Sequence, residues 1–313
     1  MAGRSPLIGG SVHQYRRLIY GVARRVTIPG PVRSGLAHLA RVIRPVVDRP
    51  IEKWLVQRPR HRQIVRNGQP LFQTVFFELR TRCNSRCTFC AASVEFEERS
   101  DTTMPFSLYT KVIDELAEIS YEGQIAYHVN NEPLMVRDLD RHIAYARAHL
   151  PNAWIRIFSN GKGLSRKKGV ALLQAGLDEM TINWYVEDGN TSEPAHIVEF
   201  RDVILPRFHA PERIRTGVGP LHEGDRSIFR FNLTIRALDA VLSTRGGSAP
   251  NKEADSSMMG FCEHPFTQFN ITTTGAVGRC CSDFFFADEM GYVRDQHILD
   301  IWYGTRFQTA RDD

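Results

Sequence analysis

The chain has no long apolar run and few cysteines, and these absences narrow the classes of protein to which it can belong. No stretch approaches the ~18 uncharged apolar residues of a membrane-spanning helix, and no fixed period indicates a repeat protein. Six cysteines among 313 residues fall far short of the ~8–10% typical of a disulfide-stabilised scaffold. Glycine and proline, at 23 and 16 residues, are too sparse for a low-complexity chain. The remaining class is a globular protein, with 42% hydrophobic residues to form one large core and a smaller second unit.

The net charge of +5 conceals two regions of opposite sign. Residues 1–70 hold 14 Arg and Lys against Asp48 and Glu52, whereas the rest of the chain holds 26 basic and 33 acidic residues. The basic region is not a secretory signal, because pairs of Arg interrupt its apolar stretches. Apolar residues at helical spacing predict helices within residues 11–47. These helices either cover the body of the protein or lie on an anionic membrane. We expect a cytoplasmic protein, membrane-associated in the second case, and no nucleic-acid partner, since no recognition module accompanies the charge.

Three cysteines directly follow a predicted strand. The β-branched and aromatic run at residues 74–79 predicts a buried strand, and Cys83, Cys87 and Cys90 follow it with C-x3-C-x2-C spacing. Three thiolates on one loop can converge on one metal centre. A structural zinc site normally takes four protein ligands, whereas a [4Fe–4S] cluster can take three cysteines and leave one iron open. The spacing therefore favours an iron–sulfur cluster, with a zinc site that uses a remote fourth ligand as the alternative.

With Phe89 directly before its last cysteine, this motif resembles that of the radical S-adenosylmethionine (radical SAM) superfamily. The resemblance implies a [4Fe–4S] cluster on Cys83, Cys87 and Cys90, with S-adenosylmethionine bound at the open iron and contacted by Phe89. It also implies a 5′-deoxyadenosyl radical that abstracts hydrogen from a substrate, and a reductant of the flavodoxin or ferredoxin type. The competing interpretation is a non-catalytic iron–sulfur or zinc protein, which predicts four protein ligands and no cleavage of S-adenosylmethionine.

The segment after the next predicted strand, residues 124–129, also resembles the superfamily. It contains Asn131, Glu132 and Pro133 where relatives carry Gly-Gly-Glu or Gly-Glu-Pro. The resemblance implies that the backbone of this element and the Glu132 carboxylate hold the methionine amino group of the cofactor. Asn131 stands where glycine is usual. The simpler interpretation of Glu132 is a cap on the helix that follows.

Two further strands end in short polar side chains. The strand at residues 153–158 is followed by Ser159 and Asn160, and the strand at residues 180–184 carries Asn183. Polar side chains at the carboxyl ends of barrel strands lie where active sites gather. The resemblance implies contacts of these three residues with the ribose of the cofactor, and a plain turn at Asn160-Gly161 is the alternative.

Strands alternate with helices from residue 73 to about residue 245, which argues for a parallel α/β barrel. The resemblance implies an open, six-stranded partial (β/α)6 barrel of the TIM type. Residues 227–235 alternate like a strand, and Arg236 follows them. For Arg236 the resemblance implies a catalytic contact with the cofactor carboxylate or the substrate, against an ion pair on the surface.

A second group of cysteines brackets a predicted hairpin. Residues 269–272 and 276–279 look like its two strands, Cys262 precedes them, and Cys280 and Cys281 follow. This arrangement resembles the SPASM or twitch domain of many radical SAM enzymes, which binds auxiliary [4Fe–4S] clusters. The resemblance implies an auxiliary cluster on Cys262 and Cys280, with Cys281 as a third ligand. No cysteine follows Cys281, so either the chain is cut short or the ligand set is incomplete; otherwise these cysteines act as small buried hydrophobes.

We therefore predict three regions: a basic helical extension at residues 1–70, a partial barrel at 71–247 and an incomplete SPASM-like region with a β-hairpin at 248–313. The predicted function is that of a radical SAM enzyme that oxidises or modifies a small metabolite such as a sugar, an aminocyclitol or a nucleoside. A ribosomal peptide is the alternative substrate. The helical, basic N-terminal region differs from the small domain with strands that usually binds leader peptides.

Overall fold

The structure, a computed structural model, describes residues 65–66, 69–94, 100–186, 192–216, 227–237, 262–284 and 286–312. The helices expected within residues 11–47, and the membrane contact expected of them, lie outside these residues. The described residues belong to two compact units: those up to Leu71 together with 262–267, and all the others. None of the helices in the described ranges is long and apolar enough to cross a membrane.

The smaller unit contains one short hairpin and one helical turn. Strands β1 (Val65–Arg66) and β2 (Gln69–Pro70) pair antiparallel, and α8 comprises His264–Thr267. Gln69 Nε2 donates a hydrogen bond to the Phe266 carbonyl oxygen at 3.4 Å. That bond ties the two parts of this unit, which are distant in sequence.

The larger unit is built on a nine-stranded sheet with the order β11-β10-β9-β3-β4-β5-β6-β8-β7. All neighbours from β9 to β7 are parallel, whereas β9, β10 and β11 pair antiparallel. The hairpin of β9 and β10 thus continues the sheet beside β3. The strands are β3 (Thr74–Phe77), β4 (Gln124–Ala126), β5 (Trp154–Ser159), β6 (Glu179–Val186), β7 (Ile214–Arg215), β8 (Phe229–Ala237), β9 (Gln268–Ile271), β10 (Ala276–Gly278) and β11 (Glu289–Tyr292).

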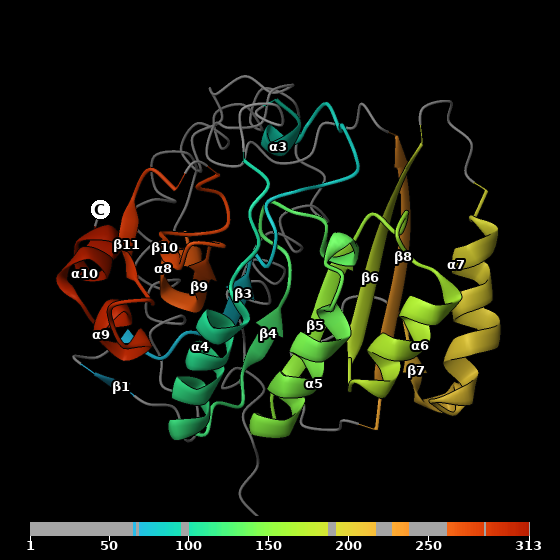
Figure 1. Cartoon of the computed structure of the whole chain (residues 1–313), viewed down its shortest axis with the longest axis horizontal. Helices are drawn as coiled ribbons and strands as arrows, with labels where there is room; N and C mark the ends of the chain where they lie inside the picture. Colours follow the sequence, from blue (N-terminus) through green and yellow to red (C-terminus); the bar gives the residue numbers. More distant parts are fainter. Residues whose placement is uncertain are drawn as a thin grey trace, which may run out of the picture. The chain divides into compact units, whose positions relative to one another are not determined.

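Helices α4, α5, α6 and α7 lie on one face of this sheet (Figure 1), which we call the outer face. The apolar side of α4 is buried there, and the Tyr109 ring packs against Phe77 of β3 with 4.9 Å between centroids. The helices are α3 (Ala91–Val94), α4 (Phe106–Glu118), α5 (Leu139–His149), α6 (Arg166–Gln174), α7 (Ala195–Glu199), α9 (Ile298–Trp302) and α10 (Thr305–Asp312), with short helices η1 (Pro133–Met135), η2 (Phe200–Ile204), η3 (Leu205–Arg207) and η4 (Pro211–Arg213).

The opposite, inner face of the sheet is polar. Side chains alternate between faces along a strand, and the strand register shows which residues share a row. One outer-face row is apolar throughout: Phe269, Val75, Ile125 and Ile155. The adjacent inner-face row contains Asn270, Phe76, Ala126, Arg156, Glu179 and Arg230. Parallel sheets are normally apolar on both faces, so the polar residues of this row depart from the usual pattern.

The predicted α/β fold is confirmed: the described residues form an open sheet that is mostly parallel, and they do not close into a barrel. The observed strands overlap every predicted one and differ from it by one to three residues at their ends. One such difference matters for the site: β8 extends to Ala237 and therefore includes Arg236. The predicted division at residues 70 and 247 stays a prediction.

Candidate functional site

The cysteine loop lies between β3 and α3, at the carboxyl end of β3. Directly before the loop, Glu132 N donates a backbone hydrogen bond to the Arg82 carbonyl at 3.0 Å. Within the loop, Cys90 N donates to the Cys87 carbonyl at 3.1 Å. Cys87 is buried, and Cys83 and Cys90 are half-buried; none forms a disulfide. The loop therefore presents three free thiols from eight consecutive residues.

Burial makes two of these thiols weak acids. It raises the pKa of Cys83 to about 12 and that of Cys87 to about 11, and neighbouring thiols add to both shifts. A metal must displace these protons because thiolate, not thiol, is the ligand. No three His, Cys, Asp or Glu side chains in the described ranges already converge as a metal site. The donor set suits an iron–sulfur cluster by residue type and spacing, and the loop must close around it.

Glu132 forms the link between the next two strand ends. Its carboxylate accepts hydrogen bonds from Leu134 N at 2.9 Å, Ser159 Oγ at 2.6 Å and Asn160 N at 2.8 Å. The side chain is 2% exposed, and burial raises its pKa. Glu132 thus caps η1, as the simpler interpretation expects, and also binds the turn after β5. These three donors occupy most of the acceptor positions that a carboxylate offers.

The amide of Asn131 is only half satisfied. Its Oδ1 accepts a hydrogen bond from Val129 N at 3.0 Å, which orients the side chain. Its Nδ2 is buried and has no hydrogen-bond partner among the described residues. A donor in this position suits an acceptor, such as a carboxylate, rather than an amino group.

The predicted ribose contacts Ser159 and Asn160 are both bonded to protein. Ser159 Oγ donates to Glu132 and accepts from Gly161 N at 2.9 Å. Asn160 Oδ1 accepts from Lys162 N at 2.9 Å. Asn160 Nδ2 donates into the cysteine loop, to Asn84 Oδ1 at 2.7 Å, Ser85 Oγ at 3.1 Å and Cys83 Sγ at 3.7 Å. The structure therefore brings Cys83, Glu132, Ser159 and Asn160 together in one network.

The remaining predicted residues are Phe89, in the cysteine loop, Asn183 on β6 and Arg236 on β8. The buried Phe89 ring packs against Tyr185 with 5.0 Å between centroids. Tyr185 is in register with Arg236, which is exposed. Asn183 lies two residues before Tyr185 and so shares the inner face. The cysteine loop is thus in contact with the carboxyl-terminal half of β6.

The second cysteine group is divided between the two units. Cys262, in the smaller unit, is half-buried and lies two residues before the start of α8. Cys280 and Cys281, in the larger unit, are half-buried and follow β10. Cys281 N donates to Gln268 Oε1 at 3.4 Å, which places that turn beside the start of β9.

Sequence reasoning missed two polar residues of the inner face, Arg156 and Asn270. Arg156 has a buried Nε without a partner, and Asn270 has a side-chain amide without one, among the residues described. A charged residue inside the apolar run WIRIF was a visible signal for Arg156. Asn270 had no such signal, because its burial depends on the pairing of β9 with β3.

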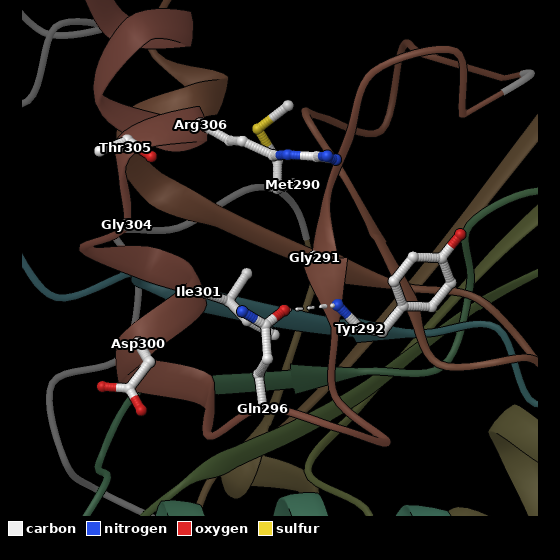
Figure 2. Close-up of a pocket in the computed structure, with 9 residues that line it drawn as sticks. All are labelled: Met290, Gly291, Tyr292, Gln296, Asp300, Ile301, Gly304, Thr305 and Arg306. Carbon is white, nitrogen blue, oxygen red and sulfur yellow. Dashed lines mark hydrogen bonds between the residues drawn. The ribbon is translucent and has the colours of Figure 1, made fainter.

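A cavity of about 260 Å³ lies elsewhere, between β11, α9 and α10 (Figure 2). Tyr292 N donates to Gln296 Oε1 across it at 3.1 Å. Asp300 and Arg306 are its charged residues, and none of the predicted site residues lines it. This cavity is therefore separate from the cysteine loop.

Comparisons with known proteins find likenesses in both sequence and fold. Residues 262–313 match the SPASM family, an iron–sulfur cluster-binding domain. The chain is 25% identical over 241 residues to the S-adenosyl-L-methionine-dependent 2-deoxy-scyllo-inosamine dehydrogenase of Niallia circulans. The aligned residues are 77% of this chain and 86% of that protein. GTP 3′,8-cyclase 2 of Mycobacterium tuberculosis is 32% identical over 111 residues, which are 34% of this chain and 29% of that protein.

Two solved structures share the fold. The structure of BtrN in complex with AdoMet and 2-DOIA matches with a TM-score of 0.57 and 26% identity, over 78% of this chain and 87% of that one. Streptococcus suis SuiB bound to its precursor peptide SuiA matches with a TM-score of 0.54 and 11% identity, over 96% of this chain and 79% of that one. At 11% identity the second likeness concerns the fold alone.

Proposed function

Because this chain is a radical SAM enzyme with a C-terminal SPASM segment, we propose that it oxidises a hydroxyl-bearing carbon of a small polyhydroxylated ring metabolite to a ketone. One observation carries the proposal: the chain aligns along 86% of a dehydrogenase whose substrate, 2-deoxy-scyllo-inosamine, is an aminocyclitol. The alternative of a peptide substrate is supported only by the fold shared with SuiB. The small-molecule substrate therefore stands first.

We assign the cofactors to the residues as follows. Cys83, Cys87 and Cys90 hold the [4Fe–4S] cluster that binds S-adenosylmethionine. Asn131 Nδ2 donates to an acceptor of the cofactor, such as its carboxylate. Glu132, Ser159 and Asn160 act mainly by holding the cysteine loop and the turn after β5 in place. Phe89 borders the same region from the cysteine loop, Asn183 from β6 and Arg236 from β8.

The reaction balances as a two-electron oxidation. When bound, the cluster and S-adenosylmethionine supply a carbon radical that takes one hydrogen atom from the substrate, at the cost of one electron from a flavodoxin- or ferredoxin-type reductant. The substrate then loses one proton and one electron to become a ketone, and methionine and 5′-deoxyadenosine are released. The second electron needs an acceptor. We assign that role to an auxiliary cluster on Cys262 and Cys280, with Cys281 as a further ligand.

The experiment is anaerobic reconstitution with iron and sulfide, reduction with dithionite, and measurement of 5′-deoxyadenosine. We expect its formation, and we expect none in the C83A/C87A/C90A variant. With a polyhydroxylated substrate that carries deuterium at the oxidised carbon, 5′-deoxyadenosine should gain one deuterium. A fully iron-loaded protein that forms no 5′-deoxyadenosine would instead support a non-catalytic iron–sulfur protein.

A further inference from the structure

Arg156 lies on the inner face of the sheet, opposite the helices. It is in register with Ala126 of β4 and Glu179 of β6, and its neighbours Ile155 and Ile157 point to the outer face. Two residues further along β5, Phe158 is half-buried on the same face, and the Arg156 guanidinium carbon lies 4.9 Å from the centre of its ring. Arg156 is thus part of the surface that the cysteine loop adjoins.

Arg156 is half-buried, and its Nε is buried without a hydrogen-bond partner in the part of the chain that the structure describes. Arg147, another half-buried arginine of the same unit, shows what a structural role looks like. Arg147 donates to the carbonyl oxygens of Gly176 and Ala153, at 3.0 and 2.9 Å, and pairs with Asp178. A buried donor without an acceptor is costly, so Arg156 is not explained by the fold alone.

The charged groups around Arg156 leave it with an excess of positive charge. The carboxylate of Glu179 attracts Arg156, but it accepts a hydrogen bond from Trp154 Nε1 at 2.9 Å and lies 3.6 Å from Arg230 Nη1. Burial lowers the pKa of Arg156, and Arg230 adds to this effect against the attraction of Glu179. Two guanidinium groups therefore face a single carboxylate on this part of the inner face.

We propose that Arg156 binds an oxyanion of the substrate, either a carboxylate or a phosphate, so that the substrate is an anionic derivative of a hydroxylated ring compound. The inference rests on the proposed function and specifies its substrate class. A guanidinium presents paired N–H donors that match both groups. The 2-deoxy-scyllo-inosamine named for the relative carries an amine, so the two enzymes differ in the substrate they select.

The position of Arg156 along β5 suits such a role. It precedes Asn160, which contacts the cysteine loop, by four residues, a rise of about 13 Å along a strand. A ring with one anionic substituent spans much of that length, so its reacting carbon faces the loop while its charge is held at Arg156. Binding energy from a remote group can in this way orient the carbon that reacts.

Matched pairs of compounds test the proposal on the reconstituted enzyme with S-adenosylmethionine. Calorimetry compares myo-inositol with myo-inositol 1-phosphate, and glucose with glucuronate, so that the phosphate and carboxylate arms are separate. In at least one of the two pairs, the anionic compound should bind at least about tenfold more tightly than the neutral one. R156M should abolish the preference and R156K should retain part of it. R166Q, at an exposed arginine, removes one charge elsewhere and should leave the preference intact.

Stability of the metal-free protein separates a binding role from a structural one. R156M removes a half-buried guanidinium whose buried Nε has no acceptor among the described residues, and it should leave the urea midpoint unchanged or raise it. Loss of a structural arginine would lower that midpoint. Equal binding within both pairs, or a preference that survives R156M, would overturn the proposal. If the enzyme forms 5′-deoxyadenosine on reduction yet shows no preference for anions, only this inference fails. If it forms none, the proposed function fails.

Discussion

Asn160 Nδ2 donates a hydrogen bond to Cys83 Sγ across 3.7 Å, which joins the turn after β5 to the cysteine loop. The same amide also donates to Asn84 Oδ1 at 2.7 Å and Ser85 Oγ at 3.1 Å. Glu132 in turn accepts from the backbone of Asn160. The loop that would hold the cluster is therefore supported by residues from two other strand ends.

Replacing Asn160 with aspartate should weaken the cluster site and shift its potential. The change removes the N–H donor to Cys83 and adds negative charge beside the sulfur, and both effects disfavour reduction. Loss of a residue that orients a metal ligand typically costs about 10–100-fold in metal affinity or activity. We expect a comparable fall in the rate of 5′-deoxyadenosine formation and a more negative midpoint potential of the cluster, measured by redox titration with electron paramagnetic resonance.

The matched control is N152D, at an exposed asparagine that bonds to Glu122 and lies outside the site. It should change neither quantity. If N160D lowers the iron content but the clusters that do assemble keep the wild-type potential, Asn160 supports the fold of the loop and does not affect the sulfur.

Replacing Asn270 with leucine should stabilise the metal-free protein. Asn270 is fully buried, and neither polar atom of its amide has a hydrogen-bond partner among the described residues. An apolar side chain of similar size removes that desolvation cost, so we expect the free energy of unfolding in urea to rise by about 1 kcal/mol. N152L at the surface should change it little. A clear loss of stability on N270L would show that the amide has a polar partner in solution.

The thiols of the metal-free loop should react slowly at neutral pH. Because burial raises the pKa of Cys83 to about 12 and that of Cys87 to about 11, the thiolate fraction grows about tenfold per pH unit from pH 7 to pH 10. Alkylation by iodoacetamide, followed peptide by peptide with mass spectrometry, should rise with that slope. An unperturbed thiol, with a pKa near 8.5, would reach a plateau above about pH 9.5, and such a plateau at Cys83 would contradict the burial of this thiol.

Iron analysis can separate the two cysteine groups. The C83A/C87A/C90A variant, reconstituted with iron and sulfide, should retain about 4 Fe per chain if the second group assembles a [4Fe–4S] cluster. The reciprocal variant C262A/C280A/C281A should retain the iron of the first group. A triple variant of the first group that holds no iron would leave the second electron of the proposed oxidation without its assigned acceptor.

The sequence by itself determined the features that depend on neighbouring residues. Three thiols within eight positions identify a cluster loop whatever the fold around them. Alternation along residues 153–158 predicts a strand because side-chain direction in a strand has a period of two residues. The cysteines around the second hairpin identified the SPASM segment in the same way, as a local pattern.

Only the tertiary structure decided which side chains meet. Asn160 reaches Cys83 across 77 positions of sequence, and Glu132 bonds to Ser159 rather than standing free for a cofactor. Arg156 is in register with Glu179, but that carboxylate bonds to Trp154 and lies beside Arg230. These pairings depend on the register between strands. Packing over the whole sheet sets that register, so it cannot be predicted from any one segment of the sequence.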